Sequence, residues 1–212
     1  MLCRRLAQAE VIMTFNIAFI LFPDFEELDF VGPYEVMAMA ARYIDTDWHV
    51  YSVAATPTVR AFHSLTVAAD HTFKNAPAPD MICVPGGFGT RPGMEDAALI
   101  DYIRRSGAAA QLVTSVCTGA MLLHRAGFLE GRRATTHWGA KKELRDLGGD
   151  TVVVDEGRWV HDGNVITAAG VSAGIDMALY IVGQLKSPED ARKVQAFMEY
   201  QPAPPYATVA SP

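Results

Sequence analysis

The sequence has few cysteines, no long hydrophobic run and no excess of basic residues. Its 212 residues include three cysteines, an odd and low number that argues against a disulfide framework and is typical of a reducing compartment. No apolar run approaches the roughly 20 residues that span a bilayer. Lys and Arg number 18 against 24 Asp and Glu, so the formal net charge is -6. These features predict a cytoplasmic protein that binds neither membrane nor nucleic acid.

Motifs for the common cofactors are missing as well. The glycines do not form the G-x-G-x-x-G or P-loop patterns that bind nucleotide phosphates. The histidines do not have the spacing of metal ligands. We therefore predict that the protein uses no cofactor and no metal.

The first residues do not form a signal peptide. Residues 1–14 include two arginines but no long apolar segment and no small-residue cleavage site. We expect residues 1–14 to be a poorly ordered extension, with Met1 or Met13 as the natural start.

Half of the residues are hydrophobic, and they fall into short runs that alternate with amphipathic segments. Continuous apolar runs predict buried strands over residues 16–22, 48–55, 81–84 and 112–116. Helical spacing predicts helices over residues 29–43, 95–106, 118–125, 139–147, 172–185 and 188–200. Shorter strands are expected as a pair within 59–69, at 133–136, and as a hairpin of 158–160 with 164–167.

Buried strands that alternate with helices are typical of a mostly parallel sheet covered on both faces. The chain has no linker, repeat or low-complexity segment, and its length suits one domain. We predict a single α/β domain over residues 15–212, with a flavodoxin-like sheet between helices. Ligands of such sheets bind beyond the carboxyl ends of the strands, where residues 85–87 and 116–119 are expected.

Cys117 lies between a predicted strand and a predicted helix, which is the context of a nucleophile elbow. The familiar elbow pattern is G-x-S-x-G, and here Ser115 and Gly119 are the small residues on either side of the cysteine. The start of a helix favours the thiolate, which is the reactive form. The alternative is a packed core cysteine, which we predict instead for Cys83 in the middle of a strand. We interpret Cys117 as reactive.

Two further segments carry polar groups near strand ends. The backbone N–H groups of Gly86 and Gly87 can hold an anion or a developing negative charge, although an ordinary turn is an equally good interpretation. Asp29 is flanked by apolar residues soon after the first strand. It is either a helix cap or an acid whose raised pKa lets it exchange protons with the thiol.

Together these segments resemble the ThiJ/PfpI superfamily, whose proteins have a glutamine-amidotransferase-like fold. The resemblance runs from about residue 16 to 206 and is carried by residues 28–33, 84–89, 114–120, 131–138 and 173–179. The isocyanide hydratase branch is the most similar one, on L-D-x-x-G-P, C-T-G, A-T-T-H-W and the late A-P-P.

The resemblance implies Cys117 as nucleophile, Asp29 as its acidic partner and Thr118 as the neighbour that helps to bind or protonate the substrate. The N–H groups of Gly87 and Thr118 would line a polar hole for the substrate. His137 in the T-T-H motif either approaches the cysteine or only hydrogen-bonds at a strand end. The superfamily also implies a homodimer with its active site near the subunit interface.

The implied reaction is the hydration of isocyanides to N-substituted formamides through a thioimidate on Cys117, with a small molecule as substrate. One alternative is a glyoxalase- or deglycase-like reaction of the same cysteine with an α-oxoaldehyde. Another is a non-catalytic redox sensor in which Cys117 is oxidised reversibly.

Several departures separate the chain from other branches of the superfamily. Thr118 follows the cysteine where the proteases have histidine, and residues 168–172 lack the His-x-Glu of glutamine amidotransferases. The chaperone and deglycase branch has glutamate where this chain has Asp29. No helix-turn-helix module follows the domain before Pro212, which argues against the related transcription regulators.

Overall fold

The structure is a computed structural model that describes residues 14–203. The predicted extension, apart from Thr14, therefore lies outside the described residues, as do Cys3 and Met13. The strands are β1 (Phe15–Leu21), β2 (Trp48–Ala54), β3 (Thr58–Arg60), β4 (Thr66–Ala68), β5 (His71–Thr72), β6 (Met81–Val84), β7 (Leu112–Val116), β8 (Arg133–Ala134), β9 (Val152–Val153), β10 (Trp159–Asp162) and β11 (Val165–Ala168). The helices are α1 (Glu27–Tyr43), α2 (Thr90–Gly93), α3 (Ala97–Ala109), α4 (Gly119–Arg125), the 3-10 helix η1 (Trp138–Ala140), α5 (Lys141–Asp146), α6 (Ala173–Leu185) and α7 (Pro188–Phe197).

The central sheet has the strand order β10-β11-β7-β6-β1-β2-β5. Its strands pair in parallel, except that β10 runs antiparallel to β11, with which it forms the predicted hairpin. Taken in chain order, the parallel strands β1, β2, β6, β7 and β11 have the spatial order 2-1-3-4-5, which is the flavodoxin-like order. The predicted fold class is confirmed.

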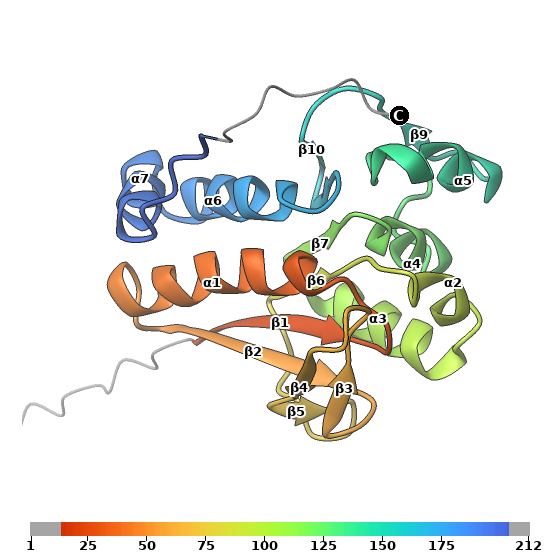
Figure 1. Ribbon diagram of the computed structural model, residues 1–212, viewed down its shortest axis with the longest axis horizontal. Coiled ribbons are helices and arrows are strands. Elements are labelled where there is room, and N and C mark those ends of the chain that lie inside the picture. The colour runs from red at the N-terminus through yellow and green to blue at the C-terminus, as the bar shows by residue number, and fades with distance from the viewer. Residues whose placement is uncertain (1–13, 204–212) are drawn as a thin grey trace, which may run out of the picture.

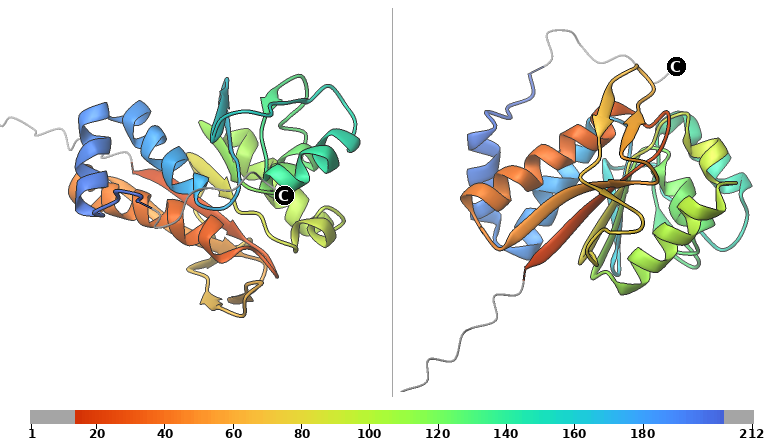
Figure 2. Two further views of the ribbon diagram at one scale, coloured as in Figure 1. Left: turned by 45° about the horizontal axis from the view of Figure 1, so that its top comes forward. Right: turned by 90° about the horizontal axis from the view of Figure 1, so that it is seen from below.

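Helices cover both faces of the sheet (Figures 1 and 2). α1 packs against α6, and α6 against α7, so these three form the layer on one face. α3 and α4 contact each other and β6 on the opposite face, and the right panel of Figure 2 shows the sheet between the two layers. The β3–β4 hairpin, predicted as a pair of short strands, projects from the body of the domain.

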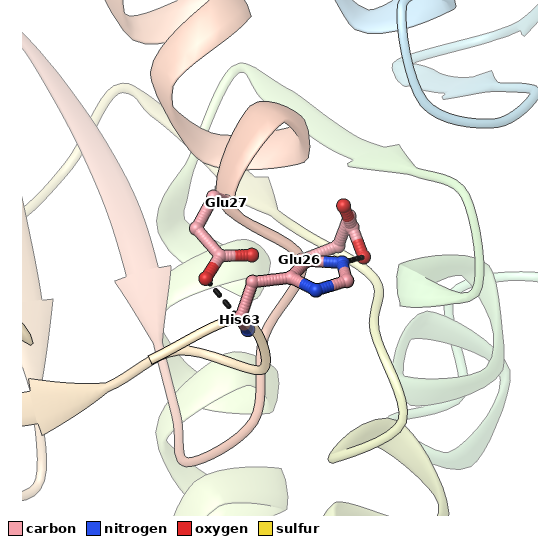
Figure 3. A group of neighbouring side chains, drawn as sticks. All are labelled: Glu26, Glu27 and His63. Carbon is pink, nitrogen blue, oxygen red and sulfur yellow. Dashed lines mark hydrogen bonds and ion pairs between the residues drawn. The ribbon is translucent and has the colours of Figure 1, made fainter. Parts of the chain in front are cut away.

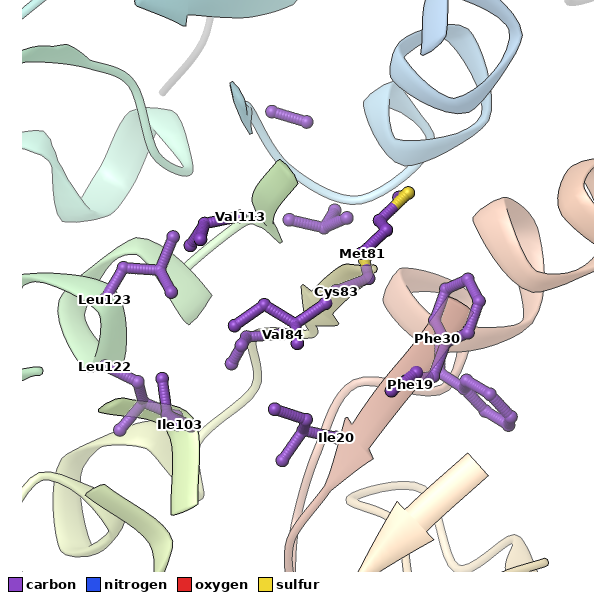
Figure 4. Close-up of a cluster of buried hydrophobic side chains, with 14 of the residues drawn as sticks. Phe19, Ile20, Phe30, Met81, Cys83, Val84, Ile103, Val113, Leu122 and Leu123 are labelled. Carbon is purple, nitrogen blue, oxygen red and sulfur yellow. The ribbon is translucent and has the colours of Figure 1, made fainter. Parts of the chain in front are cut away.

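The core forms where the central strands meet the two helix layers (Figure 4). All four residues of β6 are buried, because a central parallel strand is covered on both faces. Phe19 of β1 meets Phe30 of α1 edge to face, with ring centroids 5.7 Å apart. On the other face, Ile103 and Leu122 are fully buried. Burial of each such side chain contributes about 1.5–3 kcal/mol to the stability of the folded state.

The structure differs from the sequence prediction mainly in short elements. β5, β9 and α2 were not expected, because two to four residues show no usable periodicity and β5 and β9 depend on pairing with β2 and β8. α1 begins at Glu27, two residues before the predicted start, and Pro33 lies inside the helix. Between residues 14 and 203, no helix is long and apolar enough to cross a membrane.

Candidate active site

Cys117 occupies a strained turn between β7 and α4. Its φ of 54° lies in the left-handed region, which a residue with a side chain adopts only at a cost of about 1–3 kcal/mol. Hydrogen bonds on both sides hold this conformation. The Cys117 N–H lies 3.1 Å from the carbonyl oxygens of Ala168 and Ala169, and the Thr136 hydroxyl donates to the Cys117 carbonyl at 2.7 Å.

Small residues allow the loop after β6 to approach this turn closely. A Cβ on Gly86 would lie 2.8 Å from the Cβ of Cys117 and 2.8 Å from Oδ2 of Asp29. A Cβ on Gly119 would lie 2.2 Å from the carbonyl oxygen of Val84. Both positions therefore require glycine, and the close approach brings the loop, the turn and the start of α1 together at the carboxyl edge of the sheet.

Asp29 is fully buried in the first turn of α1, and its carboxyl group faces Cys117 rather than capping the helix. Oδ2 accepts the Gly86 N–H at 2.9 Å, whereas Oδ1 is buried with no hydrogen-bond partner among the described residues. Burial raises the pKa of Asp29 to about 8, helped by the charge of Glu26 and opposed by the Gly86 N–H and the Cys117 thiol. The carboxyl group is therefore largely protonated at neutral pH.

The charge state of the Cys117 thiol differs from the sequence expectation. Burial, followed by the neighbouring Asp29, raises the pKa of Cys117 well above its usual value, although the N–H and hydroxyl of Thr118 lower it. The start of α4, a helix of seven residues, does not outweigh the loss of hydration. The expected thiolate is thus replaced by an uncharged thiol beside a carboxylic acid.

The two glycine N–H groups that we expected to bind substrate have acceptors within the protein. Gly86 donates to Asp29, and Gly87 donates to the Thr118 hydroxyl at 3.0 Å. The same hydroxyl lies 3.1 Å from the Gly87 carbonyl oxygen. These bonds hold Asp29 and Thr118 in place, so the expected hole is not open at Gly86 and Gly87 in this structure.

His137 lies just before η1 and reaches the same site. Its Nδ1 accepts the Gly139 N–H at 3.2 Å, and its ring packs so closely on Gly170 that a Cβ there would lie 2.1 Å from Cδ2. Burial lowers the pKa of His137, although the charge of Glu26 raises it. A neutral imidazole that accepts at Nδ1 carries its proton on Nε2 and is a hydrogen-bond donor there.

A cavity of about 300 Å³ opens in front of the thiol. Its lining residues come from several elements and are Glu26, Gly87, Phe88, Arg91, Cys117, Thr118, His137, Gly139, Ala140 and Val171. Phe88 is 62% exposed and stacks on Phe62 with ring centroids 4.6 Å apart. A cavity of this size suits a small molecule.

Cys83 provides a contrast within the same sheet. It is fully buried in β6, as predicted, and burial raises the pKa of its thiol to about 12. It does not line the cavity.

Sequence reasoning missed Glu26 and Arg91, which also line the cavity. Neither belongs to a motif, and both are charged residues beside loops, where solvent exposure is the default expectation. The only available signal was the position of Glu26 three residues before Asp29.

Glu26, Glu27 and His63 form a small cluster at the edge of the cavity (Figure 3). Their nearest oxygen and nitrogen atoms lie within 4.8 Å of one another, a spacing that a metal ion can use. Glu27 Oε1 already accepts the His63 N–H at 2.7 Å, and the His63 side chain is 65% exposed. The His63 side chain is largely exposed, and acidic groups commonly lie this close together without a metal ion, so we interpret the group as a cluster of polar side chains.

Fold and site together define an α/β protein that holds a cysteine in a strained strand-to-helix turn, beside a buried carboxyl group, at one end of a small cavity. The chain belongs to the DJ-1/PfpI family, whose model matches residues 15–184. The resemblance to the ThiJ/PfpI superfamily is thereby confirmed.

Individual relatives differ in how much of their length the chain matches. The chain is 43% identical over 194 residues to the isonitrile hydratase of Pseudomonas putida, which covers 92% of this chain and 82% of that protein. It is 31% identical over 179 residues to the HTH-type transcriptional regulator CdhR of Pseudomonas aeruginosa, covering 83% of this chain and 52% of the regulator. A solved ThiJ/PfpI family protein from Pseudomonas syringae superimposes with a TM-score of 0.83 at 31% identity, covering 97% and 84% of the two chains.

Proposed function

We propose that this protein hydrates isocyanides, also called isonitriles, to N-substituted formamides, with Cys117 as the nucleophile and Asp29 as its acid. The observation that carries the proposal is the buried carboxyl group of Asp29 beside the thiol, where burial raises the pKa of Asp29 to about 8. The similarity to an isonitrile hydratase over 92% of the chain supports it.

In the first step, the terminal carbon of the isocyanide gains both a bond to sulfur and a proton. The Cys117 sulfur attacks the terminal carbon of the isocyanide, Asp29 gives its proton to that carbon, and Asp29 then takes the proton of the thiol. The product is a thioimidate, R–N=CH–S–Cys117, and Asp29 is again protonated. An uncharged starting pair suits this step because no net charge is created in the buried site.

The second step adds water to the thioimidate carbon. The electron pair of the C=N bond moves to nitrogen, which takes a proton from Asp29, while a base takes one proton of the water. The C–S bond then breaks, its electron pair returns to sulfur, and the hydroxyl proton restores the Asp29 carboxyl group. Sulfur takes the remaining proton from the base, and the formamide leaves.

Thr118 and His137 assist without forming bonds to carbon. The N–H and hydroxyl of Thr118 lower the pKa of Cys117 and so stabilise the leaving sulfur anion. The Nε2 proton of a neutral His137 would donate to the substrate nitrogen or oxygen, a role that the occupied N–H groups of Gly86 and Gly87 leave open.

The decisive experiment is turnover of an alkyl isocyanide by wild type, Cys117→Ala and Asp29→Asn, followed as formamide by chromatography and mass spectrometry. We expect wild type to turn over, Cys117→Ala to be inactive, and Asp29→Asn to lose at least about 10²-fold in kcat, as removal of an acid–base group does. Full activity in Cys117→Ala, or no formamide from wild type, would contradict the proposal.

The same assay separates the alternatives. Methylglyoxal in place of the isocyanide tests the glyoxalase- or deglycase-like reaction. The redox-sensor alternative predicts selective peroxide oxidation of Cys117 without turnover. The raised pKa of Cys117 argues against a sensor, because the thiolate is the form that peroxide oxidises.

A further inference from the structure

Glu26 forms part of the cavity wall and has no structural role in the helix that it precedes. It is the N-cap residue of α1, yet its side chain makes no capping hydrogen bond. Within residues 14–203, the one basic side chain within 4 Å of its carboxyl group is His63, whose Nε2 lies 3.6 Å from Oε2. A carboxylate that neither caps the helix nor pairs with Lys or Arg is available to the contents of the cavity.

The backbone holds Glu26 rigidly beside the reactive pair. Its N–H donates to the carbonyl oxygen of Gly86 at 2.8 Å, and Gly86 in turn donates to Asp29. A Cβ on Gly87 would lie 2.4 Å from the Glu26 nitrogen, so the loop and the start of α1 are in close contact. The charge of Glu26 also raises the pKa of both Asp29 and His137, as expected for a carboxylate that faces both.

Glu26 and Asp29 differ in their access to water. Asp29 is fully buried, one of its oxygens accepts from the Gly86 N–H, and the carboxyl group contacts the thiol. The Glu26 side chain is 22% exposed and lines the cavity together with Cys117. Asp29 is therefore placed beside the sulfur atom, to which the substrate carbon would be bonded, whereas Glu26 is on the side of the thiol that is open to the cavity.

The other charged side chains near the cavity have partners elsewhere in the protein or do not line the cavity. Arg91 of α2 is paired with Glu143 of α5 at 2.6 Å. Glu27 faces the backbone N–H of His63, and it does not line the cavity. Among the described residues that line the cavity, Glu26 is the one carboxylate.

We propose that Glu26, positioned by His63, is the general base that activates water for attack on the thioimidate, an inference that rests on the proposed function. As the oxygen–carbon bond forms, Glu26 accepts one proton of the water, and the nitrogen takes the proton of Asp29. When the C–S bond breaks, Glu26 returns its proton to the sulfur anion. Water and isocyanide are thereby converted to formamide with every group of the protein restored.

The test separates formation of the adduct from its breakdown. Wild type and Glu26→Gln are each mixed with an alkyl isocyanide under single-turnover conditions. The reaction is quenched at intervals, and the mass of the intact protein is measured by mass spectrometry. We expect Glu26→Gln to form the adduct, one isocyanide heavier, at the wild-type rate. Its breakdown should slow by about 10²-fold, so that the adduct accumulates. Added formate should partly restore breakdown in Glu26→Ala, which a merely structural role would not produce.

Glu27→Gln is the matched control, because it removes the neighbouring charge while keeping an oxygen for the His63 N–H. Glu27→Gln should break the adduct down at the wild-type rate. His63→Ala, which removes the side chain that positions Glu26, should slow breakdown by several-fold. Wild-type breakdown in Glu26→Gln would overturn the role of Glu26 and leave the proposed function standing. Absence of both adduct and formamide in wild type would instead overturn the proposed function.

Discussion

The carboxyl group of Asp29 is buried in the folded protein with no Lys or Arg among the groups that shift its pKa. Such a group loses hydration on folding and regains little of that energy through its one hydrogen bond with Gly86. Asp29 is thus expected to lower the stability of the protein whenever it is ionised. The candidate site is therefore a place where the folded protein loses stability when Asp29 is ionised.

This burial predicts how stability depends on pH. The pKa of Asp29 is raised from 3.8 to about 8 in the folded state, so between these values the folded chain holds a proton that the unfolded chain has lost. The free energy of unfolding should therefore fall as pH rises from about 4 to 8, by up to about 1.4 kcal/mol per pH unit from this group. Asp29→Asn should flatten that slope.

Chemical denaturation at several pH values measures the effect. Asp101→Asn, at an exposed position of α3, is the control for loss of one negative charge. It should keep the wild-type slope. An Asp29→Asn protein with an unchanged slope between pH 4 and 8 would mean that Asp29 is not the group responsible.

At the scale of elements, the site depends on the contact between the loop after β6 and the turn after β7. Gly86 is a point of close approach, since a Cβ there would also lie 2.6 Å from the Thr118 nitrogen. The loop, the turn and α1 consequently behave as one unit. A displacement of any of them changes the distance between thiol and acid.

Gly86→Ala should therefore cost about 1–3 kcal/mol of stability, as overpacking does, and most of the activity. Gly183→Ala is the control, because a Cβ in that part of α6 meets only ordinary contacts at 3.6 Å and beyond. It should leave turnover unchanged and raise the stability by up to about 1 kcal/mol through helix propensity. Thermal melts and isocyanide turnover measure both effects, and an active, stable Gly86→Ala would show that the close approach is dispensable.

The elements that could be predicted from the sequence are those with a local signal. β1 and β6 are continuous apolar runs, and the turn at Cys117 has small residues at fixed offsets. The charge state of Cys117 and the acceptors of the Gly86 and Gly87 N–H groups could not be predicted in this way. They depend on burial and on contacts between residues 57 or 31 positions apart.

At the scale of the whole molecule, part of the outer face of α1 is apolar and open. Leu28 and Val31 are 41% and 42% exposed, close in sequence to Asp29. We expect the homodimer that the superfamily resemblance implies to cover this face. Light scattering in solution should then give twice the 23.0 kDa mass of the chain.

Substitution of the exposed residues tests where the partner binds. Leu28→Asp together with Val31→Asp should shift the monomer–dimer equilibrium toward the monomer, because two charges would have to be buried in the interface. Tyr43→Asp changes an exposed apolar residue at the far end of α1 and should leave the mass unchanged. A monomeric wild type at micromolar concentration would contradict the expected dimer.

The uncharged pair of Cys117 and Asp29 also has a consequence for the electrophiles with which the thiol can react. An alkylating reagent forms a carbon–sulfur bond but takes up no proton. It must therefore react with a thiol that burial keeps uncharged. An isocyanide accepts sulfur and hydrogen at one carbon. If the pair acts as proposed, we expect the thiol to react with an isocyanide in preference to alkylating reagents that inactivate enzymes with a permanent thiolate.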